Sequence, residues 1–211
     1  MIVRWLGRVD YAATWQDMRA FTDRRDASTD DELWLLEHPP VFTLGMAADP
    51  GHVLDAGDIP VVQTDRGGQV TYHGPGQLVA YPLLDLRRHG LTVRSLVTLL
   101  EQSVIDLVTP SGIEAAARRD APGVYVQGRK LASLGLRVRR GASYHGLALN
   151  VDLDPAPFQR INPCGMAGLT VTSLRQLGID WSVEESGRRF AEAMQARLAA
   201  TRAATAEAPV G

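Results

Sequence analysis

Residues 66–77 read RGGQVTYHGPGQ and hold four glycines, one arginine and one histidine within twelve positions. Glycine allows the backbone to approach a ligand closely and to adopt positive φ. The same spacing also fits a β-hairpin closed by a glycine-rich turn. The segment lacks the Gly-Lys-Ser/Thr ending of a phosphate-binding loop, and it does not match a dinucleotide-binding fingerprint. It is therefore either a ligand-contacting loop or a structural hairpin.

A second feature is the loop INPCGMAG at residues 161–168, which holds the only cysteine of the chain, Cys164. Unreactive cysteines are usually buried in the core, whereas a proline–glycine setting is typical of an exposed turn. Neither a second cysteine nor a His-x-x-x-His spacing accompanies it, which argues against a metal site. A structural or incidental cysteine stays as the alternative.

Residues 128–135 (GRKLASLG) and 143–148 (SYHGLA) add two candidate proton carriers, Lys130 and His145. Lys130 is the single lysine among 22 basic residues, a skew that an arginine-biased genome also explains. Lysine can lose its proton near neutral pH in a suitable site, whereas arginine cannot. A nearby cation favours the thiolate, which is the nucleophilic form of cysteine. Lys130 and Cys164 are thus of interest as a pair, unless Lys130 is a solvated charge and His145 a hydrogen-bonded core residue.

The rest of the chain predicts alternating strands and helices without repeats or a low-complexity linker. Apolar spacing predicts a helix over Val93–Val108, and a capping box of Ser182 and Glu185 opens another that reaches about Leu198. A third helix is expected over Tyr11–Arg25. Strands are expected at 3–9, 32–37, 40–44, 61–64, 69–72, 77–86, 123–126, 130–138 and 144–151.

These elements predict an α/β (α+β) fold with a mixed sheet in a single domain, residues 1–200. Pro39–Pro40 should stop the ladder between the two strands on either side. The small, polar tail at 201–211 is expected to fray.

The composition predicts a protein of a bacterial-type cytoplasm or of an organelle matrix that binds neither membranes nor nucleic acids, and we expect the cytoplasm. Of 211 residues, 45% are hydrophobic and 22% charged, and the formal net charge is −2. No apolar run approaches the roughly 18 residues that a membrane helix needs. The N-terminal stretch lacks the pattern of a secretory signal, and a single cysteine allows no internal disulfide.

Three segments in combination resemble one family. RGGQVTYHGPGQ (66–77), KLASLGLRVRRGASYHGLALNV (130–151) and INPCG (161–165) resemble the octanoyl-[acyl-carrier-protein]:protein octanoyltransferases, also called lipoyl(octanoyl) transferases. They occur in the family order with compatible spacing, and the match covers roughly residues 37–177. The resemblance implies an acyltransferase of lipoate biosynthesis, with the catalytic fold of biotin and lipoate protein ligases, a mixed sheet packed on helices.

The resemblance also implies a cysteine–lysine dyad. Cys164 would accept an octanoyl group, as a thioester, from the phosphopantetheine of octanoyl-acyl carrier protein. Lys130 would favour the thiolate and shuttle protons. The acceptor would be a lysine of a lipoyl domain, in 2-oxoacid dehydrogenase complexes or the glycine cleavage carrier protein. No metal and no ATP would be required.

The resemblance implies a set of substrate-binding residues at the matching positions of this chain. It comprises Arg66, Gly67, Gly68, Gln69, Val70, Thr71, Tyr72, His73, Ser133, Leu134, Gly135, Gly146, Leu147 and Ala148. The chain departs from the family at Ala132 and Ala142, where relatives often carry cysteine, so any thioester must form at Cys164.

Three other functions remain open. An ATP-dependent lipoate or biotin protein ligase of the same fold would release AMP from ATP and free octanoate. A non-catalytic module that binds acyl carrier protein or a lipoyl domain would have an unreactive thiol at neutral pH. A thioesterase would pass the acyl group to water.

Overall fold

The computed structural model describes the backbone of residues 1–206 and the side chains of residues 1–201. The elements in chain order are β1 (Ile2–Arg8), α1 (Tyr11–Arg24), β2 (Glu32–Glu37), β3 (Val41–Leu44), β4 (Val61–Gln63), β5 (Val70–His73), β6 (Gln77–Leu83), α2 (Val93–Val108), β7 (Ala116–Ala117), β8 (Gly123–Val126), β9 (Arg129–Arg139), β10 (Ala142–Asn150) and α3 (Val183–Ala206). Short 3₁₀ helices η1–η5 lie at Pro50–His52, Thr109–Ser111, Ala156–Arg160, Pro163–Gly165 and Arg175–Leu177.

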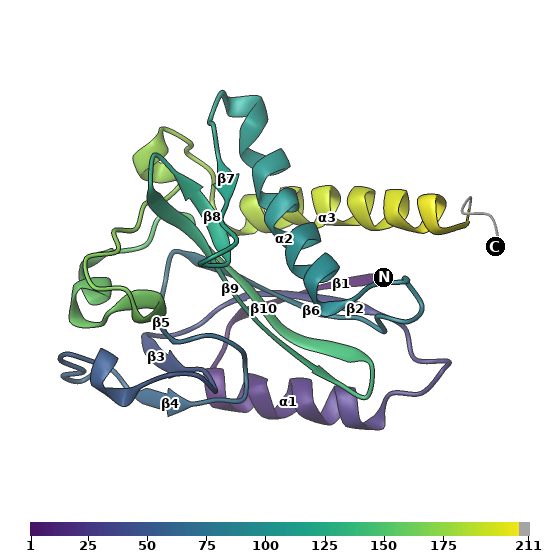
Figure 1. Ribbon diagram of the computed structural model, residues 1–211, viewed down its shortest axis with the longest axis horizontal. Helices are drawn as coiled ribbons and strands as arrows, with labels where there is room; N and C mark the ends of the chain where they lie inside the picture. The colour runs from purple at the N-terminus through teal and green to yellow at the C-terminus, as the bar shows by residue number, and fades with distance from the viewer. Residues whose placement is uncertain (207–211) are drawn as a thin grey trace.

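Two mixed sheets organise these residues (Figure 1). Seven strands form the larger sheet in the order β1-β2-β6-β10-β9-β8-β7, and three form the smaller one in the order β4-β3-β5. β1 runs parallel to β2 and β4 parallel to β3, while the other pairings are antiparallel. Pro39–Pro40 separates β2 from β3, which belong to different sheets, as expected for residues that cannot donate to a ladder. The expected α/β class with mixed sheets is confirmed.

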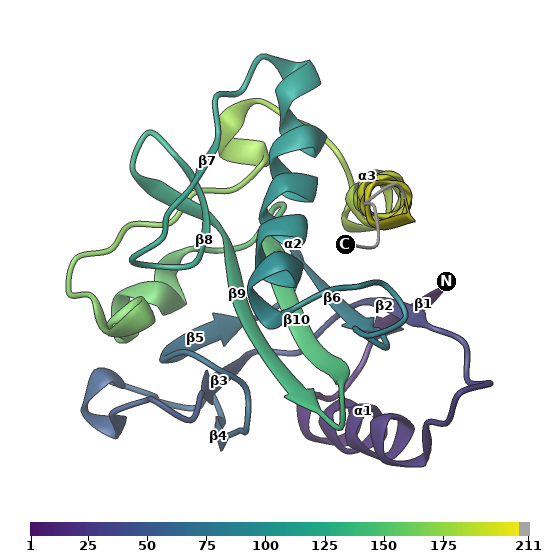
Figure 2. The same cartoon turned by 45° about the vertical axis from the view of Figure 1, so that its right-hand side comes forward.

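Helices cover both faces of the larger sheet: α2 and α3 lie on one side and α1 on the other (Figures 1 and 2). In β2, Leu33 and Leu35 join the core under α2 and α3, whereas Trp34 and Leu36 join the core under α1. Strands buried on both faces read as continuous apolar runs, which explains the sequence ELWLLE of β2. Burial of each such side chain stabilises the fold by roughly 1.5–3 kcal/mol.

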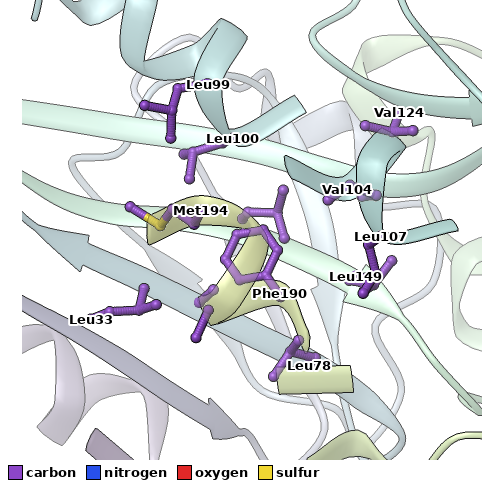
Figure 3. Close-up of a cluster of buried hydrophobic side chains, with 14 of the residues drawn as sticks. Leu33, Leu78, Leu99, Leu100, Val104, Leu107, Val124, Leu149, Phe190 and Met194 are labelled. Carbon is purple, nitrogen blue, oxygen red and sulfur yellow. The ribbon is translucent and has the colours of Figure 1, made fainter. Parts of the chain in front are cut away.

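The core under α2 and α3 ties the two helices to the centre of the sheet. Figure 3 shows Phe190 and Met194 of α3 beside Leu99 and Leu100 of α2, above the strand residue Leu78. All five side chains are buried, and Leu78, Leu100, Phe190 and Met194 are fully so. This packing fixes α2 in front of the neighbouring strands β8 and β9.

A third hydrophobic core packs between the smaller sheet and the chain segment that follows β10. The ring of Tyr72 in β5 lies with its centroid 5.6 Å from that of Phe42 in β3 and 5.6 Å from that of Phe158 in η3. These contacts hold the chain segment after β10 against β5. The same segment continues into η4, so the smaller sheet positions residues 163–165.

The observed elements differ from the expected ones mainly at their ends. The predicted bounds of β2, α2 and β8 coincide with the observed ones, and β7 is an additional two-residue strand. α3 continues to Ala206, so residues 201–206 of the expected frayed tail are helical, and 207–211 lie outside the described residues. Of the capping box, Ser182 Oγ accepts from the Glu185 amide at 3.0 Å, while the Glu185 carboxylate binds Arg188 and Arg189 instead.

Across residues 1–206, no helix combines the length and the apolar character needed to cross a bilayer.

Candidate active site

Lys130 and Cys164 meet in the structure. Lys130 Nζ donates a hydrogen bond to Cys164 Sγ at 2.9 Å and a second one to the Pro122 carbonyl oxygen at 3.1 Å. It also lies 5.3 Å from the centroid of the Tyr125 ring. Lys130 is only 2% exposed, and lysine is rarely so buried without partners. An ammonium group held against a sulfur atom in this way favours the nucleophilic thiolate.

Backbone pairing explains how two residues 34 positions apart come together. The Lys130 amide donates to the Thr170 carbonyl and the Thr172 amide donates to the Lys130 carbonyl, both at 2.9 Å. The segment that follows the cysteine loop is thus paired with Lys130 itself. On the other side of the loop, the Asn162 amide donates to the His52 carbonyl at 2.8 Å. Both ends of the loop are therefore fixed.

Cys164 has a left-handed backbone, with φ of 58° and ψ of 20°. A residue other than glycine in this region costs of order 1 kcal/mol and persists only where neighbouring structure imposes it. Here Met166 donates its amide to the Pro163 carbonyl at 3.0 Å and Gly165 to the Asn162 carbonyl at 2.9 Å. The tight turn leaves the thiol partly exposed at its apex.

A cavity of about 450 Å³ opens beside Cys164. The sequence-predicted residues that line it are Arg66, Gly67, Gly68, Gln69, Val70, Thr71, His73, Ser133, Leu134, Gly135, Gly146, Leu147 and Ala148. The remaining lining residues are Tyr11, Val79, Tyr81, Val93, Val97, Asp120, Ala121, Pro122, Leu136, His145 and Met166, together with Cys164. The cavity therefore lies between the glycine-rich segment, β9, β10 and the first half of α2.

Tyr72 is the one predicted substrate-binding residue that does not line this cavity. Its ring packs instead between Phe42 and Phe158 in the core of the smaller sheet. Tyr72 also restricts Gly74, because a Cβ at Gly74 would lie 2.2 Å from the Tyr72 hydroxyl. The structure thus gives Tyr72 a packing role.

The glycine-rich segment is not a hairpin. β5 pairs with β3 in the smaller sheet, whereas β6 pairs with β2 and β10 in the larger one. The segment therefore crosses between the sheets and brings its first residues onto β9, where the Gly67 amide donates to the Leu136 carbonyl at 2.9 Å. A Cβ at Gly135 would lie 2.9 Å from the Gly67 carbonyl oxygen, and Gly68 has φ of +87°. Close approach and positive φ explain these glycines.

Arg66 anchors the start of this segment. Its guanidinium is 6% exposed and donates to the Thr43 carbonyl at 2.6 Å, the Thr43 hydroxyl at 2.8 Å and the Gly67 carbonyl at 2.9 Å. Burial lowers the pKa of Arg66 from its ordinary value. A planar donor fork bound to fixed acceptors holds the loop and one wall of the cavity in place.

His145, the other candidate proton carrier, is bound to a carboxylate that sequence patterns did not single out. Asp65 Oδ1 lies 2.8 Å from His145 Nε2 and also accepts from Trp15 Nε1 at 2.8 Å, while Asp65 Oδ2 accepts from the Tyr144 hydroxyl at 2.5 Å. Burial alone would raise the pKa of Asp65, but these hydrogen bonds outweigh it and hold that pKa below its usual range. Burial lowers the pKa of His145. This cluster therefore braces the cavity wall.

Two further buried histidines, His38 and the cavity-lining His73, should make the protein sensitive to acid. His38 lies 2.7 Å from the Val9 carbonyl and 2.8 Å from the Tyr81 hydroxyl, and burial lowers its pKa to about 4. Burial likewise lowers the pKa of His73 to about 3. At these two residues the unfolded chain takes up protons below about pH 6.5, whereas the folded chain does so only near pH 4 and pH 3. Stability is therefore lost as pH falls below about 6.5.

We expect the free energy of unfolding to drop by about 2 kcal/mol between pH 7 and pH 5 through His38 alone. Urea unfolding at the two pH values measures this change. His38→Gln, which cannot titrate, should lose less stability over the same interval. Equal losses in the variant and the parent protein would show that His38 is not responsible.

Comparison with known proteins places the chain in a family. A model of the lipoyl protein ligase A/B catalytic domain matches residues 10–195. The chain is 60% identical over 188 residues to an octanoyltransferase of Shewanella amazonensis, covering 89% of this chain and 87% of the relative. It is 66% identical over 177 residues to an octanoyltransferase of Alkalilimnicola ehrlichii, covering 84% and 82%.

Solved structures show the same fold at low identity. A putative lipoate protein ligase from T. acidophilum superimposes with a TM-score of 0.75 at 14% identity, covering 94% of this chain and 86% of that one. Biotin protein ligase from Aquifex aeolicus gives a TM-score of 0.59 at 16% identity, covering 96% and 71%. The family match and the extent of identity to the curated relatives give the same assignment. The chain belongs to the octanoyltransferases of the lipoyl protein ligase A/B catalytic-domain family and is an acyltransferase.

Proposed function

We propose that this acyltransferase moves an octanoyl group from octanoyl-acyl carrier protein to a lysine of a lipoyl domain through a thioester on Cys164. The observation that carries the proposal is the 2.9 Å hydrogen bond from Lys130 to Cys164 beside the cavity. The names of the curated relatives support the octanoyl group. The donor and the acceptor lysine follow from the family resemblance, and we place the reaction in the cytoplasm.

The first half-reaction forms the thioester on the enzyme. The Cys164 thiolate attacks the carbonyl carbon of the donor thioester, and the carbon–sulfur bond to phosphopantetheine breaks. The departing sulfur takes a proton from the Lys130 ammonium, so the carrier leaves as a free thiol and Lys130 becomes neutral. Exchange of one thioester for another is close to thermoneutral, so this step needs no ATP.

The second half-reaction forms the amide. The neutral amine of the acceptor lysine attacks the thioester carbonyl, and Lys130 takes the proton that this nitrogen must lose. Cys164 leaves as a thiolate, which restores the starting pair of charges. Aminolysis of a thioester is downhill. Lys130 thus acts once as an acid and once as a base, in a two-step transfer that uses one cavity for two partners in turn.

The cavity suits an acyl chain. Its apolar lining includes Val93, Val97, Leu134, Leu147 and Met166, and removal of a methylene chain from water contributes roughly 0.8 kcal/mol per group. Cys164 lies among the lining residues, so a chain bound in the cavity has its carbonyl end within reach of the thiol.

An intact-protein mass after incubation with octanoyl-acyl carrier protein tests the proposal. We expect one octanoyl adduct per chain, which hydroxylamine removes and peptide mapping places at Cys164. Free octanoate with ATP should give neither the adduct nor AMP. An adduct on another residue, or transfer without any adduct, would contradict the thioester mechanism, and release of AMP would favour an ATP-dependent ligase.

A further inference from the structure

Glu101 is a buried carboxylate close to the Lys130–Cys164 pair. Val93, Val97 and Glu101 follow one another at four-residue intervals and so share one face of α2, on which the two valines line the cavity. Glu101 is 7% exposed, and acidic residues are rarely so buried without a partner. Within the described side chains, Glu101 is in none of the ion pairs at 4 Å or less.

The partner of Glu101 is a backbone amide next to the lysine. Glu101 Oε1 accepts from the Gly123 amide at 2.9 Å, and the preceding residue, Pro122, uses its carbonyl to accept from Lys130 Nζ at 3.1 Å. Glu101 therefore binds the peptide chain directly beside the contact that Lys130 makes. Residues 120–122 also line the cavity.

The Lys130 side chain lies directly against the backbone of Gly123. The φ of Gly123 is +150°, and a Cβ there would lie 2.6 Å from Lys130 Cε and 2.6 Å from the Ala132 carbonyl oxygen. The Lys130 side chain thus passes directly over the Gly123 backbone. A shift of this backbone would move both the Pro122 carbonyl and the space that the lysine occupies.

The charges of Glu101 and Lys130 also interact. Burial raises the pKa of Glu101, while the Gly123 amide and the positive charge of Lys130 act in the opposite direction. Such an interaction is screened little by salt because both groups are buried. A direct ion pair would draw Nζ towards the carboxylate and away from sulfur. With the Gly123 peptide between them, the carboxylate can stabilise the ammonium while Nζ still points at Cys164.

We propose that Glu101 is a positioning residue for Lys130. Its carboxylate holds the Gly123 amide, and with it the Pro122 carbonyl that accepts from Lys130 Nζ, and its negative charge attracts Lys130 across that peptide while Nζ points at Cys164 Sγ. The inference rests on the proposed function, because it assigns Lys130 and Cys164 the roles given above.

Glu101→Gln separates the charge of Glu101 from its hydrogen bond. The amide oxygen of glutamine can still accept from Gly123, but the negative charge is gone. Loss of a nearby negative charge disfavours the protonated forms of both the thiol and the ammonium. We therefore expect the pH–rate profile of Cys164 alkylation by iodoacetamide to move to lower pH by roughly 0.5–1 unit. Alkylation reports on Cys164 alone, since the chain has no other cysteine.

The remaining charged or titratable groups around the pair are unchanged in this variant. They are Tyr125 under Lys130, the Arg118–Asp120 ion pair beside Tyr125, Arg66 across the cavity and His52 beside the cysteine loop. A shift of the profile between Glu101→Gln and the parent protein therefore reports the charge of Glu101.

Asp106→Asn is the matched control. Asp106 lies on the same helix, is exposed and pairs with Arg197 of α3, so the variant removes the same charge from a different face of α2. Its alkylation profile should coincide with that of the parent protein. Glu101→Ala removes the hydrogen bond as well as the charge, and we expect the same shift together with slower alkylation across the pH range. If Glu101→Ala does not fold, Glu101→Gln carries the test alone.

The role of the charge is overturned if the Glu101→Gln profile superimposes on that of the parent protein, or if Asp106→Asn shifts it equally. The positioning role is overturned if Glu101→Ala alkylates Cys164 as fast as Glu101→Gln does. Failure of the proposed function has a different signature. It would appear as the absence of an octanoyl adduct on Cys164, whatever the alkylation profile. An unshifted profile in an enzyme that still forms the adduct would overturn only the role of Glu101.

Discussion

Cys164→Ala should abolish octanoyl transfer, with a loss on the order of 10⁴–10⁶-fold, as for the removal of other covalent nucleophiles. Without sulfur at this position, the donor thioester has no thiolate to attack it. The fold should persist, because backbone bonds from Asn162 and Thr172 hold the loop independently of the side chain. Loss of the hydrogen bond from the buried Lys130 should lower the free energy of unfolding by about 1.5–3 kcal/mol. The measurement is transfer to a purified lipoyl domain, followed by mass spectrometry.

Cys164→Ser is the control for that experiment. A serine hydroxyl can accept the hydrogen bond from Lys130, yet it is a much poorer nucleophile than a thiolate. We expect Cys164→Ser to recover the stability of the parent protein without recovering transfer. If the alanine variant transferred octanoate at a measurable fraction of the normal rate, the thioester route would have to be abandoned.

Lys130→Met and Lys130→Arg should each lose transfer by roughly 10²–10⁴-fold, the contribution of general acid–base catalysis. Methionine removes both the charge and the proton. Arginine keeps the charge but does not deprotonate in proteins, so it cannot serve as the base of the second half-reaction. We expect Lys130→Arg to retain part of the iodoacetamide reactivity of Cys164 near neutral pH, whereas Lys130→Met should lose most of it.

The crowding around Lys130 calls for a structural control. Lys130 Cε packs against Gly123 so closely that a bulkier guanidinium could displace the Pro122 carbonyl. Circular dichroism and a melting curve must therefore show that Lys130→Arg is folded. A folded Lys130→Arg that transfers at nearly the normal rate would mean that Lys130 contributes only charge. His73 or His145 would then be the proton carrier to test.

Local sequence patterns predict the boundaries of several elements of the fold. Helical apolar spacing predicts both ends of α2, and Pro39–Pro40 divides the strand pattern of β2 from that of β3. The 66–77 segment shows the limit of such patterns. Its spacing fits a hairpin, but β5 and β6 enter different sheets, because their partners β3 and β2 come from elsewhere in the chain. Strand partners depend on the whole sheet and not on the turn.

The sequence likewise predicts some residues of the site but not the contacts between them. Scarcity singled out Lys130 and Cys164, but their contact depends on the pairing of Lys130 with Thr170 and Thr172, which no local pattern encodes. Asp65 and Glu101 were not singled out for a related reason. Each is an ordinary acidic residue in sequence, and only the buried donors around it, from β10 in one case and Gly123 in the other, give it a role.

The burial of Lys130 limits acylation of the enzyme itself. An enzyme that carries an activated acyl group is exposed to side reactions with its own nucleophilic amines. Within these 211 residues every other basic side chain apart from histidine is an arginine, whose guanidinium does not act as an acyl acceptor at neutral pH. The single lysine is 2% exposed, so a second enzyme molecule cannot reach it. The surface of this protein therefore offers no lysine on which stray acylation could accumulate.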